Sequence, residues 1–300
     1  MLRPQTAIEK YLRHPLEAMG AMLIWGIFKI LPVDQASALG GWLARSVGPW
    51  LRLSDRARDN IRRAFPEAGD AAVERILIDT WDNLGRTVGE FPHLGAFSFT
   101  GKNPRIRIDG LEHLKHFRDD DAPGFYLSAH LGNWELAPLT AYLLNVPSAF
   151  VYREANNRSV QKLYLIGRGQ YRDMMIPKGS EGAKQIIKAL RDGKHIGIMA
   201  DQKMNNGIAV PFFGEDVMTA PALAQMALRF KCPVIGARVI REGGAYFRIE
   251  VTAPMFAEDT GNKHEDVARF MAQTNAIIEG WIRENPGQWL WLHNRWPGKQ

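Results

Sequence analysis

Residues 125–135 constrain the fold of this chain more than any other stretch. They read FYLSAHLGNWE: an apolar run ends in His130, and a short polar turn leads to Glu135. Such a run predicts a buried strand, and open α/β sheets place their ligands at the carboxyl ends of their strands. Gly132 and Asn133 are residue types that allow a tight turn. The sequence therefore predicts an imidazole at the carboxyl edge of a sheet, just before a helix.

The spacing of His130 and Glu135 limits how the two side chains can meet. Five residues of an α-helix turn through about 500°, so the two would not share one helix face. They can meet if His130 lies in the turn and Glu135 in the first helical turn. A histidine beside a carboxylate is a typical general base. A buried structural histidine, with a glutamate favoured by the helix dipole, is the alternative that these residues leave open.

The remainder of the chain alternates between strand-like and helix-like patterns. This alternation predicts an α/β fold with a mainly parallel or mixed central sheet flanked by helices. A further short strand is expected at 105–109, and the glycines of 242–245 predict a hairpin between the last two strands. The main strands are expected at 124–129, 148–152, 174–177, 195–200, 233–240 and 246–251, and helices at 136–144, 159–171, 182–191, 220–230 and 266–284.

The N-terminal part is unusually apolar. Residues 16–31 form a helical stretch whose only basic residue is Lys29, and the stretch is shorter than the roughly 20 residues that a spanning helix needs. A second apolar helix is expected at 36–53, with Trp42 and Trp50. Tryptophans at the ends of apolar helices are typical of segments that lie at a membrane interface.

Clustered arginines follow these helices, at 52–63. We therefore expect residues 1–65 to form a membrane-associating helical segment and residues 66–300 to form the α/β domain. The alternative is a helical hairpin that packs on the core and exposes a basic face to water.

Composition narrows the class of function. The chain has 300 residues, 46% of them hydrophobic, and a formal net charge of +6. A basic surface favours acidic partners such as nucleic acid, anionic lipid, phosphorylated substrates or an acidic carrier protein. Few aromatic residues are interleaved with the basic ones, which argues against a nucleic-acid module. Motifs for phosphate loops, dinucleotides, HExxH zinc sites and G-x-S-x-G nucleophiles are missing, which argues against those enzyme classes.

Polar residues follow two other predicted strands. Arg153 comes directly after 148–152, and Asp201 and Gln202 come after 195–200. In a parallel sheet these side chains would emerge at the same edge as His130. Such a cleft suits removal of a proton from a hydroxyl and anchoring of an anionic group. For Arg153, and equally for Arg168 on the following helix, the alternative is a structural ion pair.

Several of these stretches resemble one known family. Residues 130–135 resemble the His-x4-acidic motif of the lysophospholipid acyltransferase superfamily, and the glutamate resembles the branch of late lipid A acyltransferases of the lauroyl and myristoyl type. Lys203 and Asn294 depart from that branch. Further similar stretches are Tyr152-Arg153 with Asn156-Asn157, Gly167-Arg168, Ala200-Asp201-Gln202, the loop 211–214 with Thr219, and 284–296.

The resemblance implies a reaction. A fatty acyl chain would pass from an acyl thioester of acyl carrier protein to the hydroxyl of a hydroxyacyl chain on a lipid A precursor. His130 would act as general base assisted by Glu135. The thioester would be a co-substrate, and no metal or further cofactor is expected. Substrate contacts are implied for Asn133, Arg153, Asn157, Arg168, Asp201 and Gln202.

The resemblance also implies a location and partners. We expect the cytoplasmic face of a bacterial inner membrane, with acyl carrier protein, the lipid A precursor and the membrane surface as partners and no nucleic acid. Three alternatives remain: an acyl-CoA-dependent acyltransferase acting on a glycerophospholipid or a phosphatidylinositol mannoside, a non-catalytic peripheral membrane protein, and a lipid hydrolase. In the C-terminal segment, His293 and Arg295 are expected to support the sheet edge and not to take part in catalysis.

Overall fold

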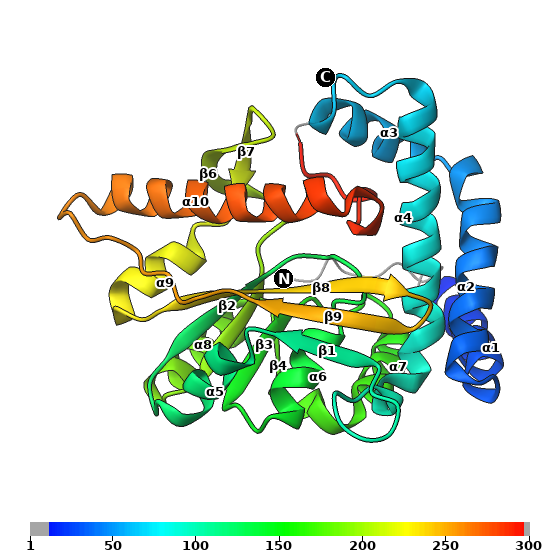
Figure 1. Ribbon diagram of the computed structural model, residues 1–300, viewed down its shortest axis with the longest axis horizontal. Helices are drawn as coiled ribbons and strands as arrows, with labels where there is room; N and C mark the ends of the chain where they lie inside the picture. Colours follow the sequence, from blue (N-terminus) through cyan, green and yellow to red (C-terminus); the bar gives the residue numbers. More distant parts are fainter. Residues whose placement is uncertain (1–11, 297–300) are drawn as a thin grey trace.

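A seven-stranded sheet forms the centre of the molecule (Figure 1). The structure, a computed structural model, describes residues 12–296. The strand order is β1-β9-β8-β2-β5-β3-β4. These strands are β1 (Ile106–Asp109), β2 (Gly124–Ser128), β3 (Ser148–Tyr152), β4 (Met175–Pro177), β5 (His195–Met199), β8 (Val234–Gly243) and β9 (Tyr246–Val251).

The sheet is mainly parallel, as the sequence predicts. Strands β8, β2, β5, β3 and β4 run parallel, while β9 pairs antiparallel with β8 and carries β1 in its own direction. The expected hairpin between the last two strands is confirmed. The carboxyl ends of β2, β5, β3 and β4 therefore meet at one edge, which is where α/β sheets place their ligands.

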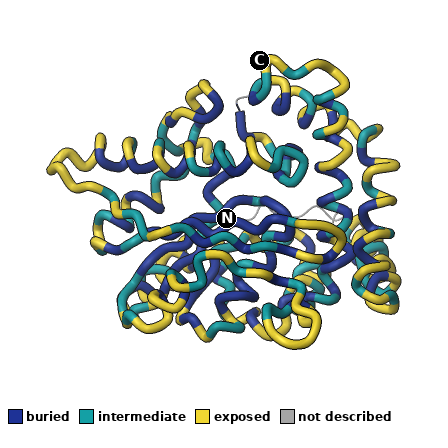
Figure 2. Tube along the Cα trace, in the orientation of Figure 1, coloured by how far each residue is buried: buried dark blue, intermediate teal, exposed yellow. Residues whose placement is uncertain are grey.

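Helices cover both faces of the sheet (Figure 1). Because side chains alternate along a strand, Phe125 and Leu127 of β2 join the core cluster that contains Trp281 of α10, whereas Tyr126 joins the cluster that contains Leu114 of α5. The interior strands are dark blue in Figure 2 because they are buried on both sides. The covering helices are α5 (Leu111–Asp119), α6 (Leu136–Leu143), α7 (Arg158–Arg168), η4 (Gly169–Met174), α8 (Ser180–Arg191), α9 (Ala222–Phe230), α10 (Lys263–Glu284) and η5 (Pro286–Gln288).

The N-terminal helices pack along one end of the sheet. Helices α2 and α4 approach each other closely: a Cβ added to Gly40 would lie 2.2 Å from the carbonyl oxygen of Gly85, so glycine is required for this approach. The division of the chain at residue 65 stays a prediction. These helices are α1 (His14–Ile30), α2 (Val33–Val47), η2 (Gly48–Trp50), α3 (Leu53–Ala64), α4 (Asp70–Glu90) and η3 (Phe91–Ala96).

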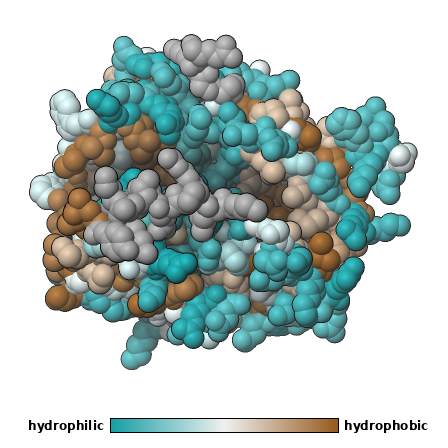
Figure 3. Space-filling model, turned by 180° about the vertical axis from the view of Figure 1, so that it is seen from behind, coloured by the Kyte–Doolittle hydropathy of each residue, from teal (hydrophilic) through white to brown (hydrophobic). Residues whose placement is uncertain are grey.

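Large apolar side chains are exposed on this helical end. Trp50 is 87% exposed and Ile30 is 85% exposed. Figure 3 shows apolar atoms gathered toward its left edge, the side on which α1 and α2 lie. Among residues 12–296, no helix is both long and apolar enough to cross a bilayer. The expected segment 1–65 includes residues 1–11, which lie outside the described residues. Other exposed side chains are Met19, Leu23, Ile27, Trp42 and Val47.

A second, two-stranded sheet that was not predicted lies between Asp201 and α9, and the expected loop at 211–214 includes its turn. Strands β6 (Lys203–Phe212) and β7 (Glu215–Thr219) form an antiparallel hairpin. The apolar alternation of Ile208, Val210 and Phe212 is the signal that predicts such a strand. This hairpin lies beside α10 (Figure 1), and the buried guanidinium of Arg295 donates to Thr219 in β7.

Candidate active site

His130 and Asp201 form the central pair of the site. They follow β2 and β5, which are neighbours in the sheet. The Nδ1 atom of His130 lies 2.8 Å from Oδ1 of Asp201, and the backbone N–H of His130 donates to Oδ2 at 2.7 Å. The indole N–H of Trp289 donates to the same Oδ2 at 2.8 Å. Three N–H groups thus fix the carboxylate, and the carboxylate fixes the imidazole.

The charge of Asp201 is stabilised inside the protein. Burial alone would raise the pKa of this fully buried carboxyl group, but the charge and hydrogen bonds of His130 outweigh burial and lower the pKa below its usual range. An ionised Asp201 accepts a hydrogen bond from Nδ1 of His130, which therefore carries the proton. The neutral imidazole of His130 then keeps its lone pair on Nε2, which is the arrangement that a general base needs.

Glu135 has other partners than the expected one. Both of its oxygens accept hydrogen bonds from Arg168, at 2.8 and 2.9 Å, and the Tyr171 hydroxyl donates to it at 3.0 Å. None of the described hydrogen bonds joins Glu135 to His130. The predicted Glu135–His130 pair is therefore wrong, because α7 brings Arg168 to the glutamate while β5 brings Asp201 to the histidine. A role for Glu135 in catalysis stays a prediction.

Arg168 belongs to a buried ion pair, the alternative that the sequence left open. Burial would lower the pKa of its guanidinium, but the hydrogen bonds and charge of Glu135 raise it above its usual value. The guanidinium also lies over the ring of Tyr152, 4.9 Å from its centroid. Arg168 also lines the cavity, and its Nη1 atom has no hydrogen-bond partner among the described residues, so its predicted substrate contact stays a prediction.

Three further predicted substrate contacts are occupied within the protein. Asp201 accepts the three hydrogen bonds already described. Asn157 caps α7 through the N–H of Ser159 and donates to the carbonyl oxygen of His14 in α1 at 2.7 Å. Asn133 is buried and donates to Glu90 at 2.9 Å. These side chains position the elements around the cavity.

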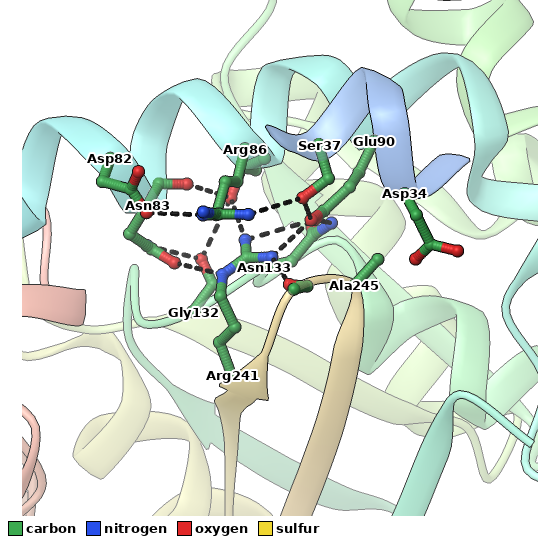
Figure 4. A network of polar contacts seen from close by, with 12 residues as sticks. Asp34, Ser37, Asp82, Asn83, Arg86, Glu90, Gly132, Asn133, Arg241 and Ala245 are labelled. Atoms are coloured by element: carbon green, nitrogen blue, oxygen red, sulfur yellow. Dashed lines mark hydrogen bonds and ion pairs between the residues drawn. The ribbon is translucent and has the colours of Figure 1, made fainter. Parts of the chain in front are cut away.

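A buried polar network holds the turn that follows His130 (Figure 4). Glu90, at the end of α4, is fully buried and accepts from Asn133, from Ser37 of α2 and from the guanidinium of Arg241 in β8. A buried charge is tolerated only when it is paired and hydrogen-bonded. This network was not predicted, since no local pattern marks Glu90 as buried.

The same network holds the backbone of the turn. The side-chain amide of Asn83 donates to the carbonyl oxygen of Gly132 at 3.0 Å, and the Thr87 hydroxyl donates to it at 3.3 Å. Gly132 has a φ of +55°, and a Cβ there would lie 2.4 Å from the carbonyl oxygen of Val239. The turn therefore requires glycine, and it holds His130 at a fixed place at the sheet edge.

His130 lies in the wall of a cavity of about 610 Å³. One part of its lining comes from the sheet, with Tyr126 and Phe150, and another from the N-terminal helices, with Trp25 of α1 and Val88 of α4. Apolar side chains make up most of the lining. Such a cavity suits a long hydrocarbon chain whose reacting end lies at the histidine.

Polar side chains at the strand ends line the same cavity. Arg153 and Gln202 are among them, as the sequence predicts. Lys178, which follows β4, also lines the cavity and was not predicted. The position of Lys178 beside the cavity follows only from the pairing of β3 with β4, which the sequence does not reveal.

His293 lies closer to the pair than expected. Its Nε2 atom is 3.9 Å from Oδ2 of Asp201, and the His130 and His293 rings meet edge to face at 5.4 Å. Burial and the charges of His130 and Arg295 lower the pKa of His293 to about 4, against the opposing effect of Asp201, so the ring is neutral at pH 7. One ring nitrogen of His130, one carboxylate oxygen of Asp201 and one ring nitrogen of His293, atoms of the kind that ligate metal ions, all lie within 4.8 Å of one another. Within the cluster only His130 and Asp201 share hydrogen bonds, and His293 packs against the pair with neither ring nitrogen hydrogen-bonded to a described residue.

Comparisons with known proteins identify the family of this chain. The sequence model of the family described as bacterial lipid A biosynthesis acyltransferase matches residues 6–297. The chain is 24% identical to the lipid A biosynthesis palmitoleoyltransferase of Escherichia coli K12, over 97% of this chain and 95% of the relative. It is 22% identical to the lipid A biosynthesis lauroyltransferase of the same organism, over 94% and 92%. The chain therefore belongs to the bacterial lipid A biosynthesis acyltransferase family, and the protein is an acyltransferase that acts on lipid A.

Proposed function

We propose that the protein transfers a fatty acyl chain from an acyl carrier protein thioester to the hydroxyl of a hydroxyacyl chain on a lipid A precursor. His130 is the general base, and Asp201 orients its ring and stabilises its charged form. The observation that carries the proposal is that His130 lines a largely apolar cavity while the buried Asp201 holds its ring from behind. The family membership supports the acceptor class.

The reaction needs no covalent enzyme intermediate. Nε2 of His130 takes the proton of the acceptor hydroxyl as its oxygen attacks the thioester carbonyl carbon. The tetrahedral intermediate collapses, the carbon–sulfur bond breaks, and the departing thiolate takes the proton from the imidazolium. The products are an ester and a thiol, and His130 is again neutral. Asp201 keeps its charge throughout, as the carboxylate of a catalytic triad does.

The proposed reaction uses no cysteine of the protein. The only cysteine, Cys232, is buried, and burial raises the pKa of its thiol to about 11. It is thus a poor nucleophile. We propose that the acyl thioester is the only co-substrate and that the protein needs no further cofactor.

The exposed apolar face of α1, α2 and η2 supports a membrane role. Large apolar side chains on a surface mark contact with a protein or a lipid, and the lipid A acceptor is itself a membrane lipid. We propose that this face lies in the lipid interface at the cytoplasmic side of the bacterial inner membrane. The net charge of +6 fits recruitment of an acidic carrier protein and an anionic membrane, with no role for nucleic acid.

The direct test is mass spectrometry of a lipid A precursor incubated with the protein in membranes and with acyl carrier protein carrying mixed acyl chains. A mass gain of one acyl group, lost in His130→Ala, supports the proposal, and fragmentation of the product identifies the acceptor chain. Acylation of glycerophospholipids from acyl-CoA instead would replace this proposal with a different acyltransferase. Release of free fatty acid without any acylated lipid would indicate a hydrolase.

A further inference from the structure

Two cations stand side by side at the mouth of the cavity. Arg153 follows β3 and Lys178 follows β4, and these strands are parallel neighbours. The backbone N–H of Lys178 donates to the carbonyl oxygen of Tyr152, the residue before Arg153, at 2.8 Å. Both side chains line the cavity that His130 lines. The strand pairing therefore places Arg153 and Lys178 next to each other at the sheet edge, in the wall of the cavity that His130 also lines.

Neither cation has a carboxylate partner within residues 12–296. No ion pair or side-chain hydrogen bond joins Arg153 or Lys178 to another described residue, whereas Arg168, in the same cavity wall, has a bidentate partner in Glu135. Asp201 is the one carboxylate that acts on Lys178 through its charge, and it already accepts three hydrogen bonds. Glu135, the carboxylate of the described cavity lining, is thus committed to Arg168, and the buried Asp201 to His130 and Trp289.

The charges of Arg153 and Lys178 disfavour each other. The pKa of Lys178 is lowered by partial desolvation of its ammonium and by the charge of Arg153, although the residue as a whole is solvent-exposed. An anion bound between the two would remove this repulsion. It would also receive charge-assisted hydrogen bonds from a guanidinium, which can bind two oxygens at once, and from an ammonium.

The strand order determines how far an anion between Arg153 and Lys178 would lie from His130. Along the order β2-β5-β3-β4, His130 follows the first strand, Arg153 the third and Lys178 the fourth. Neighbouring strands lie about 4.8 Å apart, so the two cations are displaced by about 10 and about 14 Å from the strand that carries His130. A group bound there would share the cavity with the reacting atoms but lie at a distance from them.

We propose that Arg153 and Lys178 together form a binding site for a phosphate group of a substrate. The inference rests on the proposed function, which offers two sources of this chemistry: a phosphate on the lipid acceptor and the phosphodiester of the donor's phosphopantetheine arm. Arg168 and Asp201 take no part in this site. The residue that the sequence did not single out, Lys178, supplies the second cation.

The test compares substrates that differ only in phosphate. The variants are Lys178→Gln and Arg153→Gln, with Lys184→Gln as a matched control, because Lys184 is exposed on α8 and pairs with Glu181 outside the cavity. The donors are an acyl-phosphopantetheine and the acyl-pantetheine that lacks the phosphate. The acceptors are a lipid A precursor and the same lipid after removal of its phosphates. Initial rates give kcat/KM for each combination.

A lost charge-assisted hydrogen bond predicts a fall in kcat/KM of about ten- to a hundredfold in each cavity variant with the fully phosphorylated substrates. If the site binds the donor phosphate, the fall in kcat/KM shrinks to about twofold with acyl-pantetheine. If it binds the acceptor phosphate, the fall shrinks to about twofold with the dephosphorylated lipid. The control variant keeps the wild-type value with every substrate.

Two results would overturn the inference: no fall with any substrate, or an equal fall with and without phosphate. Either result leaves the proposed function standing as long as the wild-type protein acylates the lipid A precursor. Failure of the wild-type protein to acylate that lipid with any donor counts against the proposed function instead. The phosphate comparison can then be repeated on whichever acceptor the protein does acylate.

Discussion

The imidazole of His130 and the carboxylate of Asp201 lie 2.8 Å apart although 71 positions separate them in the chain. Glu135, only five positions from the histidine, is turned toward Arg168 instead. The site thus contains two separate charge pairs, one that can move a proton and one that holds the wall of the cavity. We therefore expect substitution of Glu135 to change mainly stability and substitution of Asp201 to change mainly kcat.

Glu135→Gln should act mainly on stability. The substitution leaves the buried guanidinium of Arg168 without its counter-charge, and breaking a buried ion pair from one side costs about 3–5 kcal/mol. Unfolding by urea measures this loss. A companion variant that replaces both Glu135 and Arg168 by glutamine should lose less than the sum of the two single variants. Unchanged stability in Glu135→Gln, with activity abolished, would contradict the wall-holding role.

The Glu90–Arg241 network should control the geometry of the catalytic turn. Glu90→Gln leaves Arg241 buried without a full counter-charge and weakens the hold on Asn133, so we expect a loss of about 3–5 kcal/mol of stability. We also expect a lower kcat in the protein that remains folded at low temperature, because His130 would be less well placed. Thermal unfolding and initial rates below the transition measure both effects. A stable variant with wild-type kcat would show that the network is dispensable.

Stability should fall in mild acid because of His293. Its pKa is about 4 in the folded protein, against an ordinary value of 6.5, since burial disfavours the charged ring. Between these two values the unfolded chain binds more protons, so the free energy of unfolding decreases as the pH drops through this window, by about 3 kcal/mol in total.

His293→Gln should flatten that pH dependence, and His264→Gln, at an exposed position on α10, serves as its control. Urea unfolding at several values of pH between 4 and 7 measures the slope. An equal slope in wild type and His293→Gln would rule out this histidine as the source.

The exposed apolar face should direct membrane binding. Replacing Ile30 and Trp50 by serine removes two highly exposed side chains without touching the lining of the cavity. We expect weaker co-flotation with vesicles of anionic lipid and unchanged activity toward substrates dissolved in detergent. Equal flotation of the variant and the wild type would contradict the assignment of this face. Point variants are preferable to deletion of α1, because Trp25 and Phe28 of that helix line the cavity.

The sequence predicted the parts of the site that depend on local pattern. The apolar runs before His130 and Asp201 marked two buried strands, and a parallel sheet placed both residues at one edge. The pairing of side chains was not predictable in this way. Nearness in sequence favoured Glu135, whereas the pairing of β2 with β5 brings Asp201 to the histidine. Lys178 and Glu90 were missed for the same reason, since only tertiary contacts give each its place.

The most direct test of the central claim is the initial rate of acyl transfer to a lipid A precursor by Asp201→Asn. An asparagine keeps the shape of the side chain, but its amide would donate toward Nδ1 of His130 and leave the proton on Nε2, so the histidine could no longer act as a base. Provided that thermal unfolding shows the variant to be folded, we predict a fall in kcat of about 10³- to 10⁴-fold with little change in KM, as for the corresponding change in a serine protease triad. A folded Asp201→Asn protein with a kcat near the wild-type value would contradict the assignment of the His130–Asp201 pair.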